Sequence, residues 1–427
     1  MAIAIDEQIA KVIIWILYFV GLYFSLFWFS VLIFEKDKNE KKKEGYTPKI
    51  TIILPMWNEQ DSVEQTLESV YNLNYPKNKL KVICVDNNSN DNTPKILKRL
   101  NKKWDFLHLT EKKQGKHNAM NLGLKHTNSP FFACLDADSF VEPDSVKNMI
   151  LEFNNENVGA VTPIMKVSKP ENILQRVQWL EYLMNIFYKY IMGKLDCIHV
   201  TPGPLSIYRT DVVNKLGGFK KGHLTEDLEM ALRLQDNDYK IKQSLDGFVY
   251  TISPMKLKGF IAQRTRWYHG TFLNIKDYKH FLFNKRYEEF GIFHIPMVAL
   301  TGILSIIGIL TLSYLFIKEM YFDIKRMHMT HFDFATYIAN YKFEFDLLSF
   351  DWMTLFTSSV LMLLIFIIIY LSFVGTKERT NIFKNIKYFF MFLYYFVVYR
   401  FLMGYIWIKV GWRLLTKHGG SWTKDNN

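Results

Sequence analysis

Four long apolar runs flank a more polar middle section of the chain. They cover residues 12–34, 290–317, 352–374 and 388–408. A helix needs roughly 20 apolar residues to cross the hydrocarbon core of a bilayer, so each run is a candidate membrane helix. No small-residue cleavage site follows the first run, which favours an anchor over a removed signal peptide. The pattern predicts a membrane protein whose middle section folds as a separate domain.

Within that middle section, short apolar strands alternate with amphipathic helices. Strand character is present at residues 50–55, 81–86, 106–109, 131–135 and 158–162. Helices are predicted at residues 61–73, up to about 102, at 116–125, 143–153 and 171–195. Apolar strands separated by helices predict an α/β fold with a mostly parallel sheet covered on both faces. The last of these helices is rich in aromatic residues, so it lies either on the domain surface or in the membrane interface.

Polar side chains stand where the predicted strands end. Glu59 follows the first strand, Asp86 ends the second, and Asp136 and Asp138 follow the strand at 131–135. In such sheets ligands bind outside the carboxyl ends of the strands. Two carboxylates this close repel each other unless one is protonated or a cation binds, and a hard divalent ion with free positions for phosphate is one solution. Asp-x-Asp alone is usually an exposed turn, but the convergence of successive strand ends favours a site.

Three further stretches carry candidate chemistry. Gly203 stands in a turn and permits close approach of backbone to a ligand. Asp227 lies in the first turn of a predicted helix, where it either stabilises the helix dipole or serves as a general base. Gln263, Arg266 and Trp267 precede the second apolar run. They are either an interface anchor or a set that holds a diphosphate and stacks on a sugar.

The distribution of charged residues and cysteines indicates which partners and which compartment to expect. The 427-residue chain has a net charge of +12, 49% hydrophobic residues and 16% aromatic residues. Basic residues concentrate beside the apolar runs, at Lys36, Lys38, Lys41, Lys42 and Lys43 and at Lys377, Arg379, Lys384 and Lys387. This pattern is typical of cytoplasmic flanks beside an anionic leaflet and argues for a lipid bilayer and against nucleic acid as partner. The separated Cys84, Cys134 and Cys197 indicate a reducing compartment without disulfides.

The topology of the C-terminal part has two interpretations. Three crossings after a cytoplasmic middle domain would place the C-terminus outside, whereas Lys409, Arg413 and Lys417 favour the inside. The aromatic segment at residues 388–410 is therefore either a span or a re-entrant or interfacial segment.

Five ordered motifs together resemble a known family. They are Pro55–Glu59, Asp86, Asp136-x-Asp138, Thr225-Glu226-Asp227 and Gln263-x-x-Arg266-Trp267. This set is similar to the membrane-embedded family 2 glycosyltransferases, which include the cellulose, hyaluronan, chitin and poly-N-acetylglucosamine synthases. The resemblance covers about residues 48 to 275 and implies a GT-A nucleotide-sugar-binding domain inserted between transmembrane helices.

The resemblance also implies an organisation and a role for each motif position. The expected parts are an N-terminal transmembrane helix (1–35), a basic cytoplasmic linker (36–49), a cytoplasmic GT-A domain (50–255), an interfacial region (256–289) and a C-terminal transmembrane region (290–427). The donor would contact Pro55, Glu59, Asp86, Lys116, Asp136, Gln263, Arg266 and Trp267. Asp138, with Asp136, would bind a divalent metal, Mg²⁺ or Mn²⁺, and Asp227 would be the catalytic base. The acceptor would contact Gly203, Pro204, Leu205, Glu226 and Trp267.

The implied function is an inverting hexosyltransferase that extends a β-linked polysaccharide at the plasma membrane. UDP-N-acetylglucosamine is the preferred donor and UDP-glucose the other candidate; export of the product and a homo-oligomer stay open. The family often has a second Asp and a Gly after its first Asp, whereas Asn87 and Asn88 follow Asp86 here. The alternative is non-processive transfer of one sugar to a lipid-linked acceptor. A transporter with a nucleotide-sensing domain is disfavoured because the apolar runs show no internal repeats.

Overall fold

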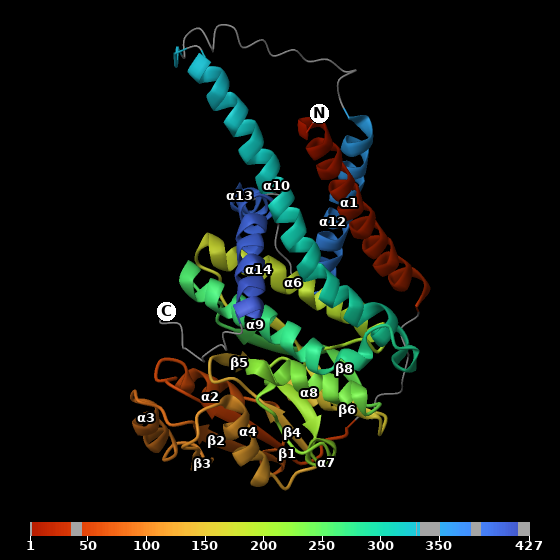
Figure 1. Cartoon of the computed structure of the whole chain (residues 1–427). Helices are drawn as coiled ribbons and strands as arrows, with labels where there is room; N and C mark the ends of the chain where they lie inside the picture. Colours follow the sequence, from red (N-terminus) through yellow and green to blue (C-terminus); the bar gives the residue numbers. More distant parts are fainter. Residues whose placement is uncertain (1, 36–44, 330, 334–350, 377–385, 417–427) are drawn as a thin grey trace.

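A computed structural model describes residues 2–35, 45–329, 331–333, 351–376 and 386–416 of the chain. An α/β domain lies at one end of the molecule, and long apolar helices extend from it (Figure 1). The basic residues Lys36, Lys38, Lys41, Lys42, Lys43, Lys377, Arg379, Lys384 and Lys417 lie outside the described residues.

The α/β domain is built on an eight-stranded sheet in the order β3-β2-β1-β4-β7-β6-β8-β5. Its first four neighbours, β3 (Leu107–Thr110), β2 (Leu80–Asp86), β1 (Ile50–Met56) and β4 (Phe131–Cys134), are parallel. The next strand, β7 (Ser206–Arg209), runs antiparallel to both of its neighbours, β4 and β6 (Val158–Val167). β8 (Lys240–Thr251) runs parallel to β6, and β5 (Ser139–Val141) pairs antiparallel with β8. The predicted α/β class with a mostly parallel sheet is confirmed.

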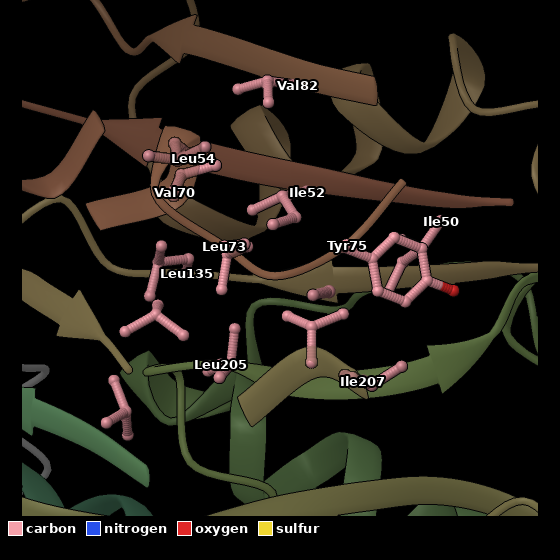
Figure 2. Packing of buried hydrophobic residues seen from close by; sticks show 14 of the residues in the cluster. Ile50, Ile52, Leu54, Val70, Leu73, Tyr75, Val82, Leu135, Leu205 and Ile207 are labelled. Atoms are coloured by element: carbon pink, nitrogen blue, oxygen red, sulfur yellow. The ribbon is translucent and has the colours of Figure 1, made fainter. Parts of the chain in front are cut away.

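Helices cover both faces of this sheet, because the strands are apolar on both faces. One face packs against α2 (Val63–Tyr71), α3 (Thr93–Leu100) and α5 (Ser145–Ile150). The other packs against α4 (Lys116–Lys125), α7 (Thr210–Lys215) and α8 (Glu226–Asp236). Figure 2 shows the first core, where Leu135, from the end of β4, and Leu205, from the loop before β7, lie among strand side chains such as Ile52 and Leu54. The loops at the sheet edge are therefore anchored by apolar residues in the core.

Four helices are long and apolar enough to cross a membrane, judged by length and composition in the described part of the chain. The candidate spans are Gln8–Phe34, Phe290–Met329, Trp352–Gly375 and Phe390–Thr416. They belong to α1 (Ala2–Phe34), α10 (Ile295–Met329), α12 (Trp352–Gly375) and the pair α13 (Ile386–Phe396) and α14 (Val398–Thr416). The break between α13 and α14 falls at Val397, inside the segment whose topology was open.

Two helices join the sheet domain to the apolar helices. They are α6 (Ile173–Lys194) and α9 (Leu257–Asp277), which lie between the sheet and the long helices in Figure 1. One apolar cluster combines side chains of α1, α6, α9, α12, α13 and α14. Most of α6 is buried in this cluster, so α6 is a packed connection between the two parts rather than a free surface helix.

Candidate functional site

Lys116 connects two of the motifs that sequence analysis singled out. Its Nζ lies 2.6 Å from Oδ1 of Asp136 and 3.3 Å from Oε1 of Glu226. Lys116 is the first residue of α4, Asp136 follows β4, and Glu226 is the first residue of α8. The exposed fractions of the three side chains are 19%, 28% and 11%, so the ion pairs are largely shielded from water. Burial alone would lower the pKa of Lys116, but the two carboxylates raise it well above its usual value.

The loop before β7 lies directly against this ion pair. A Cβ added to Gly203 would lie 2.7 Å from Oδ2 of Asp136 and would also press on the Lys116 ammonium. Any larger residue would require Lys116 or Asp136 to move, whereas glycine permits this close approach. Pro204 and Leu205 follow in the same loop, and Leu205 is fully buried with a positive φ of 61°. The structure thus brings Gly203, a predicted acceptor-side residue, into contact with two predicted donor-side residues.

Asp138 lies in an excess of negative charge. Burial, followed by the charges of Asp136 and Glu59, raises the pKa of Asp138 to about 7. The hydroxyl of Ser139 donates a hydrogen bond to Asp138 (3.1 Å). Glu59 is held nearby: its backbone N–H donates to Thr93 Oγ1 (2.8 Å), and its carboxylate accepts from Ser62 (2.8 Å). A cation bound nearby would favour the ionised form of such a carboxyl group.

Asp227 and its neighbour Glu226 have different surroundings. Burial and the neighbouring charge of Glu226 raise its pKa to about 6. Burial also acts to raise the pKa of Glu226, but Lys116 lowers it below its usual value. Thr201 fixes the backbone of Asp227 by donating from its hydroxyl to the Asp227 carbonyl (2.8 Å). The two adjacent carboxyls therefore differ: Glu226 is paired with Lys116 and its pKa is lowered, whereas the pKa of Asp227 is raised to about 6.

The ends of β1 and β2 lie side by side at the same sheet edge. Pro55 pairs with Val85 and Met56 with Asp86. Asp86 is buried and accepts a hydrogen bond from the backbone N–H of Ser89 (3.2 Å). The side chain of Asn87, the residue that departs from the family pattern, donates to the carbonyls of Glu111 (3.1 Å) and Lys113 (2.9 Å). Its Oδ1 accepts from Gly115 N (2.8 Å), so Asn87 shapes the loop that delivers Lys116.

The motif residues on α9 contact different parts of the structure. Arg266 donates to the carbonyl of Leu224 (3.0 Å), and its charge acts on Glu226 and Asp227. One face of the Trp267 indole is covered by the Arg264 guanidinium, 4.2 Å from the ring centroid. Gln263 Oε1 accepts from Arg264 (2.9 Å). Across the described ranges, no hydrogen bond or ion pair joins Gln263 to the carboxylates at the sheet edge.

Two polar groups near the site were missed by sequence reasoning. Arg264 is fully buried and its Nη2 lies 2.7 Å from Glu181 of α6. The sequence signal that could have indicated this pair is a charged residue within an aromatic-rich helix. His199 Nδ1 lies 2.7 Å from His294 Nε2, and burial, with the charge of Lys189, lowers the pKa of His199 to about 4. His199 lies in a loop and His294 ends the short helix Phe290–His294, 95 residues further along the chain, so no local pattern could predict their pairing.

The acidic side chains at the sheet edge are candidate metal ligands. In the part of the chain that the structure describes, no group of three or more His, Cys, Asp or Glu side chains has the arrangement of a metal site. Mg²⁺, however, often binds one or two carboxylates together with substrate phosphates. Asp138, half-buried beside two other acids, fits that requirement, while Asp136 already forms an ion pair with Lys116.

The sheet and its covering helices form a GT-A fold that lies between apolar helices in the sequence. Residues 51–217 match the model of glycosyl transferase family 2. This stretch is therefore a glycosyltransferase family 2 domain, and the resemblance drawn from the motifs is confirmed.

More than half of this chain is similar to curated proteins. A poly-β-1,6-N-acetyl-D-glucosamine synthase of Staphylococcus epidermidis is 29% identical over 266 residues, 60% of this chain and 64% of that protein. The synthase of Staphylococcus aureus strain MSSA476 is 30% identical over 237 residues, 55% of this chain and 56% of that protein. The chain thus spans less than two thirds of the length of these relatives. A mannosyltransferase of Pyrobaculum calidifontis, solved with GDP-Man and Mn²⁺, shares the fold with a TM-score of 0.59 and 20% identity, covering 78% of this chain and 96% of that chain.

Proposed function

We propose that the chain is an inverting glycosyltransferase that moves a sugar from a UDP-sugar to a growing β-linked polysaccharide at a membrane. The observation that carries the proposal is the position of Lys116, which forms ion pairs with both Asp136 and Glu226. These pairs bring the strand-end carboxylates and the helix with Asp227 into one site. A donor diphosphate and an acceptor hydroxyl need just such adjacent groups.

The donor would bind along the sheet edge. Asp86, beside the end of β1 with Pro55 and Glu59, would contact the nucleoside, and Lys116 with Asp136 would lie at its phosphates. Arg266 and Gln263 would reach the diphosphate from α9, because an arginine forms strong charge-assisted hydrogen bonds with phosphate oxygens. The names of the staphylococcal relatives support N-acetylglucosamine as the sugar.

Asp138, with Asp136, would hold the divalent metal, Mg²⁺ or Mn²⁺. The raised pKa of Asp138 supports this assignment, because burial and the charges of Asp136 and Glu59 outweigh the opposing effects of Ser139 and Lys116. A metal bound there would supply Lewis-acid stabilisation of the charge that develops on the leaving diphosphate.

Asp227 would remove the proton from the acceptor hydroxyl. Its pKa near 6 leaves the carboxylate ionised at neutral pH while keeping it basic enough for proton transfer. Attack by that hydroxyl from the side opposite the diphosphate inverts the anomeric centre. The bond from the anomeric carbon to the diphosphate oxygen breaks as the new glycosidic bond forms, so an α-linked donor gives a β-linked product.

The acceptor would lie between the loop of Gly203, Pro204 and Leu205 and the helices α8 and α9. Glu226 and the Trp267 indole would contact its terminal sugar. The candidate spans support a multi-pass protein of the plasma membrane, with the middle domain (residues 50–255) in the cytoplasm, where UDP-sugars are made. The region 256–289 would then lie at the membrane interface.

The test uses the purified full chain with UDP-sugars and Mg²⁺ or Mn²⁺, measuring UDP release and product length. A ladder or a high polymer from UDP-N-acetylglucosamine supports the proposal. A single sugar added to a lipid would replace it by the non-processive alternative, and absence of UDP release with every UDP-sugar would overturn both. Chelation with EDTA is expected to abolish release, and Mn²⁺ to restore it.

A further inference from the structure

The segment that leads into Glu226 and Asp227 has a strained backbone. It consists of residues 222–225, called the 222–225 segment below. Gly222, His223 and Leu224 have positive φ angles of 51°, 53° and 70°. Residues other than glycine rarely adopt this conformation, so the surrounding contacts must hold it in place. Since Asp227 follows only two residues later, whatever holds this segment also determines where the proposed base lies.

One face of α9 supplies these contacts. The residues involved are Arg266, Gly270, Asn274 and Asp277, spaced by four, four and three positions. Side chains at this spacing lie above one another on one side of a helix. This spacing is visible in the sequence, but only the structure shows what the face contacts.

Each residue of the 222–225 segment meets this face. Asn274 Nδ2 lies 2.9 Å from both the Gly222 carbonyl and Thr225 Oγ1 and donates to them. His223 Nε2 lies 2.7 Å from Asp277 Oδ2, and the Leu224 carbonyl accepts from Arg266 (3.0 Å).

Gly270 allows the helix to come this close to the segment. A Cβ at Gly270 would lie 2.5 Å from Thr225 Oγ1 and 3.2 Å from the carbonyl of His223. Asn274 is 1% exposed, so its amide is held in this arrangement with little access of water.

We propose that this face of α9 positions the catalytic base, with Asn274 and Gly270 as positioning residues that act through Thr225. The inference rests on the proposed function, because it assigns a task to residues outside the motif set of the same site. It also gives α9 two tasks. Its N-terminal half carries Gln263, Arg266 and Trp267 toward the diphosphate and acceptor, and its C-terminal half fixes Asp227. A shift of α9 would therefore change binding and base position together.

The test compares Asn274→Ala with Tyr278→Phe in the full-length protein. Tyr278, at the C-terminal end of α9, donates to Glu229 of α8 (2.7 Å) and so joins the same two helices without touching the 222–225 segment. For Asn274→Ala we expect kcat to fall about 10- to 100-fold, the effect of a small misplacement of a catalytic group, with the donor KM within about threefold of wild type. Tyr278→Phe is expected to keep kcat within about twofold. An unchanged kcat in Asn274→Ala, or a change confined to KM, overturns the proposal.

A double-mutant cycle with Thr225→Val tests the route. If Asn274 acts through Thr225, the two losses in kcat will not add; additive losses overturn that route. Asp277→Ala, at an exposed position of the same face, keeps the question answerable if Asn274→Ala does not fold. It is expected to lower kcat several-fold, and no change in it would count against the proposal.

Hydrogen exchange separates this inference from the proposed function. Amides of residues 222–228 are expected to exchange faster in Asn274→Ala than in wild type, and at the wild-type rate in Tyr278→Phe. Absence of transferase activity in the wild type would defeat the proposed function alone, and faster exchange would still support the positioning contact. Equal exchange in all three proteins would overturn the positioning contact whatever the activity.

Discussion

Arg264 and Glu181 form a buried ion pair that joins α9 to α6, with Nη2 and Oε2 2.7 Å apart. The arginine side chain is fully buried and the glutamate side chain is 16% exposed. Tyr399 of α14 donates to the same Oε2 (2.7 Å). The helix that carries Gln263, Arg266 and Trp267 is thus connected through polar groups to the apolar helices as well as to the sheet domain.

Breaking this ion pair is expected to destabilise the protein. Arg264→Met leaves a carboxylate without its cation in an apolar cluster, and losing one partner of a buried pair costs about 3–5 kcal/mol. Tyr399→Phe removes a single hydrogen bond, which is worth about 0.5–1.5 kcal/mol. Thermal unfolding of the full chain in detergent should therefore show a much larger fall in Tm for Arg264→Met. The double variant Arg264→Met with Glu181→Met should recover part of that fall; equal Tm values for both single variants would contradict the role of the pair.

Gly203→Ala is expected to weaken donor binding. The added methyl group would lie 2.7 Å from Oδ2 of Asp136, so Asp136 or the Lys116 ammonium must move. A displacement of this kind should lower UDP affinity about tenfold or more. Isothermal titration with UDP and Mn²⁺ measures the change. Gly193→Ala is the matched control, since its methyl group would meet only Ile198 Cδ1 at an ordinary 3.5 Å. Equal UDP affinity in Gly203→Ala and Gly193→Ala would refute the close approach.

Much of the first half of the sheet could be predicted, because each of its strands and helices has a recognisable pattern within its own stretch of sequence. The helix predicted at residues 116–125 coincides with α4, and the strands at 50–55 and 81–86 are β1 and β2. These strands are apolar on both faces, which only a buried parallel strand requires. Polar residues at their ends then indicate the site, because carboxyl ends of parallel strands meet at one edge.

The rest depends on contacts distant in sequence. β8 was not predicted, since Lys240–Thr251 carries polar residues and a glycine and shows no clear alternation. β5 has only three residues, too few for a pattern. Asp136 and Asp138 were expected to face one cation, but the structure gives Asp136 a partner in Lys116, the first residue of α4. No local pattern shows which side chain a distant helix will bring to a carboxylate.

Asn87→Asp, the change toward the usual family residue, is expected to harm this chain. Asn87 is 2% exposed and its Nδ2 donates to two backbone carbonyls, of Glu111 and Lys113. A carboxylate would point oxygen at oxygen, and a buried group left without its hydrogen bonds costs about 1–3 kcal/mol. We expect a lower Tm and weaker UDP binding, because the loop before Lys116 would shift. Asn88→Asp changes the charge equally at an exposed neighbour and should leave both quantities unchanged. If both variants behave alike, the effect is one of charge rather than of hydrogen bonding.

The pH dependence of transfer should report the ionisation of Asp227. Its pKa of about 6 lies above the usual value for an aspartate, so the base is protonated and inactive at lower pH. We expect kcat to be constant above about pH 7 and to fall roughly tenfold per pH unit well below about pH 6. Asp227→Asn should abolish transfer at every pH while UDP still binds, because the substitution removes the base but not the donor contacts. Binding of UDP and Mn²⁺, measured over the same pH range, separates this ionisation from that of Asp138. If binding falls in parallel with kcat, the acidic limb belongs to the donor site, and loss of UDP binding in Asp227→Asn would assign Asp227 a binding role instead.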